Sequence, residues 1–185
     1  MPIIKRKQIV NPDHKVNIFS EAFSSTLWVG HIPVASGTFG TLFGLLFFFI
    51  PIFNSYYILI PTIVICFLLG IYTSEQMIKR YGHDPSVVVI DEVVGVWITM
   101  LFVVHIMVYV DFQLQFITLG VAFLTFRFFD IIKIWPSKYF DRMNSGWGIM
   151  MDDVIAGLYA GIVTFLIIHT LLLTAIIVGM DGKVL

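Results

Sequence analysis

The stretch VVVIDEVVGVWITM, residues 87–100, places two adjacent carboxylates, Asp91 and Glu92, inside an apolar run. Each acidic side chain costs roughly 2.5 to 3.5 kcal/mol at the centre of a membrane-spanning helix. Neither a capping position nor an adjacent cation in the sequence accounts for the pair. The stretch therefore predicts a helix of a membrane protein in which the two acids serve a purpose.

Composition supports a membrane protein. Of the 185 residues, 58% are hydrophobic and 12% are charged, and the mean hydropathy is +0.94. A soluble domain carries about 25% charged residues. We therefore predict an all-α, polytopic membrane helical bundle. A net charge of −1 and a pI near 6.5 provide no basic surface for nucleic acid. The single cysteine, Cys66, excludes an intrachain disulfide.

Five apolar stretches are candidates for membrane helices. They cover about residues 38–53, 55–72, 86–110, 114–132 and 154–178. A spanning helix needs about 20 residues, which the last three stretches provide and the first barely does. We predict about five spanning or partly spanning helices, with four as the alternative. The preceding TLWVGHIPVASG, residues 26–37, is apolar but contains Gly30, Pro33 and Gly37, which is typical of a re-entrant or interfacial segment.

The basic residues predict the orientation. Lysine and arginine occur before the first stretch, between the second and third, and between the fourth and fifth: Lys5, Arg6, Lys7, Lys15, Lys79, Arg80, Lys133, Lys138 and Arg142. The other two connections contain none. Because cytoplasmic loops are enriched in lysine and arginine, the N-terminus and both basic loops are predicted to be cytoplasmic.

The predicted domain organisation is simple. Residues 1–23 form a polar, basic cytoplasmic arm without the apolar core of a signal peptide. Within this arm Val16, Ile18, Phe19 and Phe23 suggest an interfacial helix. Residues 24–180 form one membrane-embedded domain, and residues 181–185 form a short tail. The spacings Gly40-xxx-Gly44 and Gly157-xxx-Gly161 predict close helix packing.

The predicted topology brings charged residues from distant positions to the cytoplasmic face. The acids that form the candidate catalytic set are Asp91, Glu92, Asp130, Asp141, Asp152 and Asp153. Carboxylates from several helices are the oxygen ligands that Mg²⁺ prefers, so all of these except Asp141 are candidate metal ligands. The candidate phosphate-binding residues are Arg127, Lys133 and Arg142, together with Ser36, Gly37 and Thr38 at a predicted helix start.

Simpler interpretations exist for each group. Arg127 and Asp130 can form an intrahelical ion pair, and Asp152 and Asp153 can stabilise a helix N-terminus. Ser36 or Thr38 can cap a helix. For the whole chain, the alternatives to an enzyme are a divalent-cation transporter and a scaffold whose charges only fix topology. His31 and His83 are candidate proton relays, and His105 and His169 are predicted to form structural hydrogen bonds.

Motifs then narrow the chemistry. The sequence lacks the cysteine-phosphatase loop, the DxDx[TV] motif, the PSGH segment and the CDP-alcohol phosphotransferase pattern. The segments VASGTFGTL, HDPSVVVIDEVVGVWITM and FRFFDIIKIWPSKYFDRMNSGWGIMMDDVIAG closely resemble phosphatidylglycerophosphatase A, a bacterial lipid phosphatase family. The resemblance covers roughly residues 28–165. It implies Mg²⁺-dependent removal of the terminal phosphate from phosphatidylglycerophosphate at the bacterial inner membrane, in phospholipid biosynthesis.

The family motifs fall on the charged positions. The DE pair corresponds to Asp91 and Glu92, the FR-x-x-D motif contains Arg127 and Asp130, and the FDR motif contains Asp141 and Arg142; the G-[IM]-M-x-DD-x-x-AG element contains Asp152 and Asp153. Many relatives have a proline at the position of Ser36, and some have one at the position of Ile134. Mg²⁺ would neutralise the phosphate and activate water, with an aspartate nucleophile as the alternative. The oligomeric state and the number of ions stay open.

Overall fold

The chain folds as a bundle of helices. The computed structural model describes residues 10–181, with side chains through residue 177. In chain order the α-helices and 3₁₀-helices (η) are α1 (Ile18–Ser24), η1 (Val29–His31), α2 (Ser36–Leu46), η2 (Phe47–Phe49), η3 (Pro51–Asn54), α3 (Tyr56–Tyr81), α4 (Ile90–Leu101), α5 (Phe112–Ile132), α6 (Ser137–Asp141) and α7 (Gly146–Asp181). Residues 10–181 contain no β-strand, which confirms the all-α class. The predicted arm residues Lys5, Arg6 and Lys7 and tail residues 182–185 lie outside the described part.

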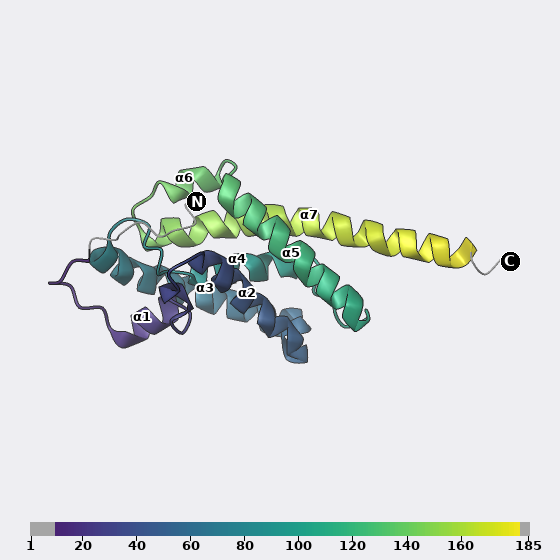
Figure 1. Ribbon diagram of the computed structural model, residues 1–185, viewed down its shortest axis with the longest axis horizontal. Coiled ribbons are helices and arrows are strands. Elements are labelled where there is room, and N and C mark those ends of the chain that lie inside the picture. Colours follow the sequence, from purple (N-terminus) through teal and green to yellow (C-terminus); the bar gives the residue numbers. More distant parts are fainter. Residues whose placement is uncertain (1–9, 182–185) are drawn as a thin grey trace.

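Three helices are long and apolar enough to cross a membrane. They are α3 (26 residues), α5 (21 residues) and the described part of α7, Gly146–Ile177 (32 residues). At a rise of 1.5 Å per residue, α5 alone is about 30 Å long, the thickness of a bilayer's hydrocarbon core. In Figure 1, α7 runs along the long dimension of the molecule and α5 crosses it obliquely, with α1 and α6 toward the end opposite the C-terminus. The predicted membrane bundle therefore holds.

The apolar stretch 86–110 does not form one spanning helix, so this prediction is wrong. Only Ile90–Leu101 is an α-helix, and turns follow to residue 110. Ten of the twelve residues of α4 are buried inside the protein. A helix that is hydrophobic on all sides is typical of a protein core. The apolar run thus reflects burial among neighbouring helices, and α4 and the equally short α2 are the partly spanning members of the five.

Glycines allow α4 to approach its neighbours closely. A Cβ on Gly157 of α7 would lie 2.4 Å from the carbonyl oxygen of Gly95 on α4. On the other side of α4, a Cβ on Gly44 of α2 would lie 2.9 Å from Val96 Cγ1. The indole Nε1 of Trp97 also donates a hydrogen bond to the Gly44 carbonyl at 2.8 Å. The predicted small-residue packing is therefore present on both sides of α4.

Helix α7 starts earlier than the predicted residue 154. Its first residue is Gly146, whose backbone N–H donates to Glu75 Oε2 on α3 at 2.8 Å. A carboxylate from a neighbouring helix thus satisfies one of the free N–H groups at the helix start. As a result Asp152 is the seventh residue of α7. The interpretation of Asp152 and Asp153 as first-turn acids is wrong, because the helix dipole acts within the first turn.

The structure contains a helix, α1, where the sequence predicted one in the arm. Its start carries exposed Ile18 and Phe19, whereas Val16 and Phe23 pack against the hydrophobic core. The side-chain amide oxygen of Asn17 accepts a hydrogen bond from the Phe19 N–H and caps the helix. The four apolar residues are therefore divided between the protein and its surroundings.

The α4–α7 contact gives a test of the packing. Gly157→Ala places a methyl group against a backbone carbonyl, so the helices must separate at a cost of about 1 to 3 kcal/mol. We expect a clearly lower thermal unfolding midpoint in detergent, measured by circular dichroism. The matched control is Gly120→Ala on α5, where no atom lies within 4 Å of the added Cβ. Equal midpoints for the two variants would contradict the packing.

Candidate active site

A small cavity lies where the starts of α2, α4 and α7 meet the end of α5. Its volume is about 40 Å³. The predicted site residues that line it are Ser36, Asp91, Glu92, Asp130, Lys133, Asp141, Asp152 and Asp153. Residues from a wide span of the sequence therefore meet at one place, as the topology predicted.

Asp91 and Glu92 lie in the first turn of α4, which starts at Ile90. Acids in the first turn gain from the positive end of the helix dipole, which partly explains why the apolar run tolerates them. The preceding segment is fixed by two hydrogen bonds: Ser36 Oγ donates to the Ser86 carbonyl at 2.8 Å, and the Val89 N–H donates to the Ser24 carbonyl at 2.9 Å. These bonds set where α4 begins.

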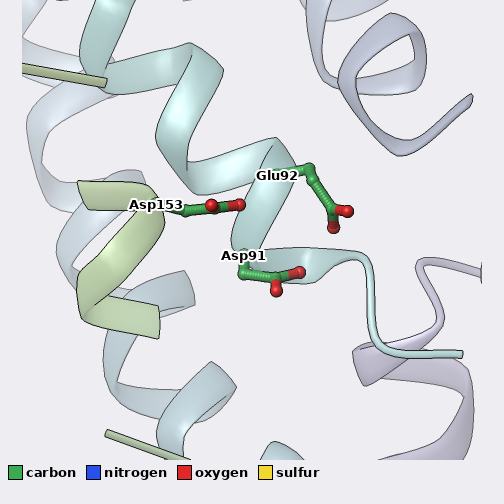
Figure 2. Close-up of side chains that lie close together, drawn as sticks. All are labelled: Asp91, Glu92 and Asp153. Atoms are coloured by element: carbon green, nitrogen blue, oxygen red, sulfur yellow. The ribbon is translucent and has the colours of Figure 1, made fainter. Parts of the chain in front are cut away.

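Asp153 of α7 completes a group of three carboxylates. One oxygen each from Asp91, Glu92 and Asp153 lies within 4.8 Å of the other two. Figure 2 shows Asp153 on its own helix, with its carboxylate directed toward α4. Glu92 and Asp153 are buried, with exposures of 6% and 3%. Three carboxylates this close repel one another strongly where water is excluded.

The group suits a divalent cation. Asp91 Oδ1 and Glu92 Oε2 are buried and have no hydrogen-bond partner among the described residues. Buried polar atoms are normally satisfied, so these two oxygens indicate a missing positive partner. Carboxylate oxygens are the ligands that hard divalent cations take in proteins. The three acids, from two helices, therefore fit a metal ion.

Lys133 joins the other acids of the cavity. Its Nζ donates to Asp152 Oδ2 at 2.6 Å and also to Asp141. Burial lowers the pKa of the Lys133 ammonium group, but the Asp152 charge and the hydrogen bonds to both carboxylates raise it more, to above its ordinary value. Lys133 is therefore a fixed positive charge at the cavity.

Lys133 does not continue the face of Arg127 and Asp130, as a continuous helix would require. It ends α5 in the left-handed conformation, with φ of 51°, and turns toward α6 and α7. Arg127 and Asp130 do pair within α5, at 2.8 Å. Asp130 therefore has both predicted features, because it pairs with Arg127 within α5 and also lines the cavity.

The predicted phosphate-binding residues are only partly brought together. Gly37 packs beside Glu92 and Arg127, because a Cβ there would lie 2.1 Å from Glu92 Oε1 and 3.2 Å from Arg127 Nη1. Arg127, Gly37, Thr38 and Arg142 do not line the cavity, and Arg142 is exposed. The prediction that Ser36 or Thr38 caps α2 is wrong: α2 already includes Ser36, and the residue at the cap is Ala35.

The structure adds three residues that were not predicted for the site: Asp84 in the loop before α4 lines the cavity, and Met143 and Ile149 form apolar parts of its wall. His83, predicted as a candidate proton relay, also lines the cavity. The tripeptide His83-Asp84-Pro85 directly precedes the apolar run, and this turn-like signal could have pointed to the loop.

Three other histidines contact groups outside the cavity. His31 contacts Glu21 at 3.2 Å instead of the cavity, so it is not placed to relay protons there. His105 contacts the Tyr56 hydroxyl at 3.2 Å, and His169 contacts the Phe165 carbonyl at 2.9 Å. The prediction of hydrogen-bonded roles for His105 and His169 is confirmed.

Comparison with known proteins identifies the family. The family model described as phosphatidylglycerophosphatase A matches residues 22–168. Phosphatidylglycerophosphatase A of Haemophilus influenzae is 36% identical over 91% of this chain and 96% of its own length. The Escherichia coli protein of the same name is 32% identical over 87% of each chain.

A third relative carries a different name. A putative phosphatidylinositol-3-phosphatase of Bacteroides thetaiotaomicron is 35% identical over 71% of this chain and 82% of its own length. No solved structure matches the chain. The match over residues 22–168 spans every helix that contributes to the cavity. The chain therefore belongs to the phosphatidylglycerophosphatase A family and is a phosphatase enzyme.

Proposed function

We propose that the chain is an Mg²⁺-dependent phosphatase that hydrolyses phosphatidylglycerophosphate to phosphatidylglycerol and phosphate in phospholipid biosynthesis. The observation that carries the proposal is the group formed by Asp91, Glu92 and Asp153, which faces a cavity together with Lys133. The names of two relatives supply the substrate. The catalytic domain is proposed to be residues 24–180, embedded in the bacterial inner membrane.

The proposed ligands of Mg²⁺ are Asp91, Glu92 and Asp153, the three acids whose oxygens approach one another. Asp130 and Asp152 were also candidate ligands, but each already pairs with a cation, Arg127 or Lys133. We therefore assign these two acids to holding the cations in place. When bound, Mg²⁺ would supply Lewis-acid stabilisation of negative charge on the phosphoryl group.

The chain's own cations have distinct roles in this proposal. Lys133 offers a point charge to the phosphate oxygens, and its two carboxylate partners fix its position. Arg127 lies beside Gly37, where the lack of a side chain leaves room for the guanidinium next to Glu92. Asp141, which lies on α6, accepts a hydrogen bond from Lys133 and holds it in position. A phosphoryl group in the cavity would then meet positive charge on the α5 side.

Two other functions were considered. A cation transporter would place its acids near the middle of the membrane with access from both sides, whereas this cavity is lined by residues from the starts of α2 and α4, the first turns of α7 and the end of α5. The family membership disfavours a scaffold. The Bacteroides relative suggests a second substrate, a phosphatidylinositol 3-phosphate, which belongs in the same assay.

The decisive experiment measures phosphate release by purified protein from phosphatidylglycerophosphate and from phosphatidylinositol 3-phosphate. We expect rapid release from the first lipid with Mg²⁺, loss of release with a chelator, and recovery when Mg²⁺ is added back. Asp91→Asn and Asp153→Asn should each lower the rate about 100-fold or more, because each removes a charge from the proposed ligand set.

The matched control is Asp111→Asn. Asp111 caps α5 by accepting from the Leu114 N–H at 2.9 Å, a role that asparagine can take over, and it does not line the cavity. The control should keep the wild-type rate. Metal-independent release, or near-normal rates for the two site variants, would reject the proposed metal site; faster release from the inositol lipid would replace the proposed substrate.

Lys133 gives a separate prediction. Among the described residues, Lys133 is the only lysine that lines the cavity. We expect Lys133→Met to lower the rate about 100-fold, the loss typical when one donor that stabilises the transition state is removed. Lys138→Met on α6 removes an exposed lysine nearby and should have little effect. Thermal unfolding of both variants must be measured, since Lys133→Met leaves Asp152 without its cation. Equal rates for the two variants would exclude a role for Lys133.

We propose that the cavity faces the cytoplasm, from the distribution of lysine and arginine. In a Cys66→Ser background, Lys138→Cys should react with a membrane-impermeant maleimide only after the cells are permeabilised. Tyr109→Cys, at an exposed position (87%) after α4, should react in intact cells whose outer membrane admits the reagent. The reverse labelling pattern would invert the proposed orientation.

A further inference from the structure

Helix α5 has two opposite faces. Its buried side chains recur every four residues at Thr118, Ala122, Phe126 and Asp130. Its exposed positions recur at Phe116, Gly120, Leu124, Phe128 and Ile132. Because α5 is long and apolar enough to cross a membrane, we expect its exposed face to contact lipid.

Both faces of α5 end at the C-terminal end of the helix, where residues that line the cavity lie. Asp130 closes the buried face, and Lys133 follows one turn later; both line the cavity. The exposed face continues past the end of α5 into Ile134 and Trp135, which are 41% and 77% exposed. The exposed apolar side chains Ile132, Ile134 and Trp135 therefore lie directly before and after Lys133 in the chain, and Lys133 lines the cavity.

The exposed loop is held in place. The Trp135 carbonyl accepts a hydrogen bond from the Tyr159 hydroxyl of α7 at 3.1 Å. On the preceding side, Lys133 is fixed by its carboxylate partners on α6 and α7. The backbone on both sides of Ile134 is thus tied to α7, while the Ile134 and Trp135 side chains point outward. Tyr139 of α6, 58% exposed, adds a second aromatic ring.

The cavity is much smaller than a phospholipid. A volume of about 40 Å³ has room for about three water-sized groups. A phosphoryl group fits in such a space, but the glycerol backbone and two acyl chains of a lipid must lie outside it. A lipid whose phosphoryl group lies in the cavity must therefore also contact the protein surface beside the cavity.

We propose that the diacylglycerol part of the substrate lies against Ile132, Ile134, Trp135 and Tyr139, a surface we call the rim platform. The inference rests on the proposed function and extends it, by assigning the residues that select a bilayer lipid over a water-soluble phosphate ester. Tryptophan and tyrosine suit the level of the glycerol and ester groups, since each has an apolar body and a polar edge.

The first test compares two substrates that share a headgroup. One is phosphatidylglycerophosphate with long acyl chains in mixed micelles, and the other has six-carbon chains and is used as monomers. For Ile134→Ser/Trp135→Ser we expect the ratio of kcat/KM between the long-chain and short-chain substrates to fall about tenfold, mainly through KM. Trp147→Ser is the control, because Trp147 is an exposed tryptophan (46%) that lies outside the cavity lining and contacts Phe67. Its ratio should stay at the wild-type value.

Equal losses on both substrates, or no loss on either, overturn the rim platform. If the wild-type protein is an oligomer in detergent and the double variant is a monomer, the surface is an interface between copies of the chain. The inference is then wrong. A wild-type protein that releases phosphate from neither lipid rejects the proposed function instead, and the following measurement still decides the inference.

The second test needs no turnover. Fluorescence of the protein with Mg²⁺ is measured in vesicles that contain a few per cent of lipid with brominated acyl chains, carried either by a non-hydrolysable phosphonate headgroup or by phosphatidylcholine. The part of the quenching that Trp135→Leu removes should be larger for the phosphonate lipid, because a lipid held by its phosphonate group keeps its chains on the platform. Equal quenching by the two lipids overturns the inference.

Discussion

The structure depends on one close contact, the backbone approach of α4 and α7 at Gly95 and Gly157. In this region one oxygen each from Asp91, Glu92 and Asp153 lies within 4.8 Å of the other two, with Glu92 and Asp153 buried. Their mutual repulsion opposes the contact, so helix packing and the electrostatics of the site are in direct conflict. The conflict is relieved when a cation lies between the helices. Such an ion stabilises the fold and the site together, as metal sites generally do.

Some features of the fold and of the site follow from local sequence rules, and these could be predicted. Features that depend on contacts between residues far apart in the sequence could not. Charged residues in a membrane bundle face its interior, so the meeting of Asp91 and Glu92 with Asp153 follows from topology alone. The end of α4 at Leu101 does not follow, because apolar residues that touch lipid and those buried in protein look alike in sequence. The start of α7 depends on Glu75, seventy-one positions away from Gly146.

Single residues show the same limit. Lys133 follows Asp130 by three residues, a spacing that would put both on one face of a continuous helix, but it takes a left-handed conformation that L-residues other than glycine rarely adopt. Two carboxylates on α6 and α7 hold it there, and neither is close to it in sequence. Asp84 also has a positive φ, 48°, in the loop that lines the cavity. Such conformations are found where surrounding structure enforces them, often at functional sites.

The negative charge of the cavity favours the binding of a cation before the binding of a phosphate group. Seven carboxylates line it, those of Asp84, Asp91, Glu92, Asp130, Asp141, Asp152 and Asp153, and Lys133 is the one lysine or arginine among the lining residues. A phosphate ester is repelled by such a surface until positive charge is added. Divalent cations are attracted for the same reason. The affinity of this enzyme for phosphate should therefore depend on a bound cation. The lipid contacts outside the cavity involve uncharged side chains, so their contribution to substrate binding should be independent of the cation.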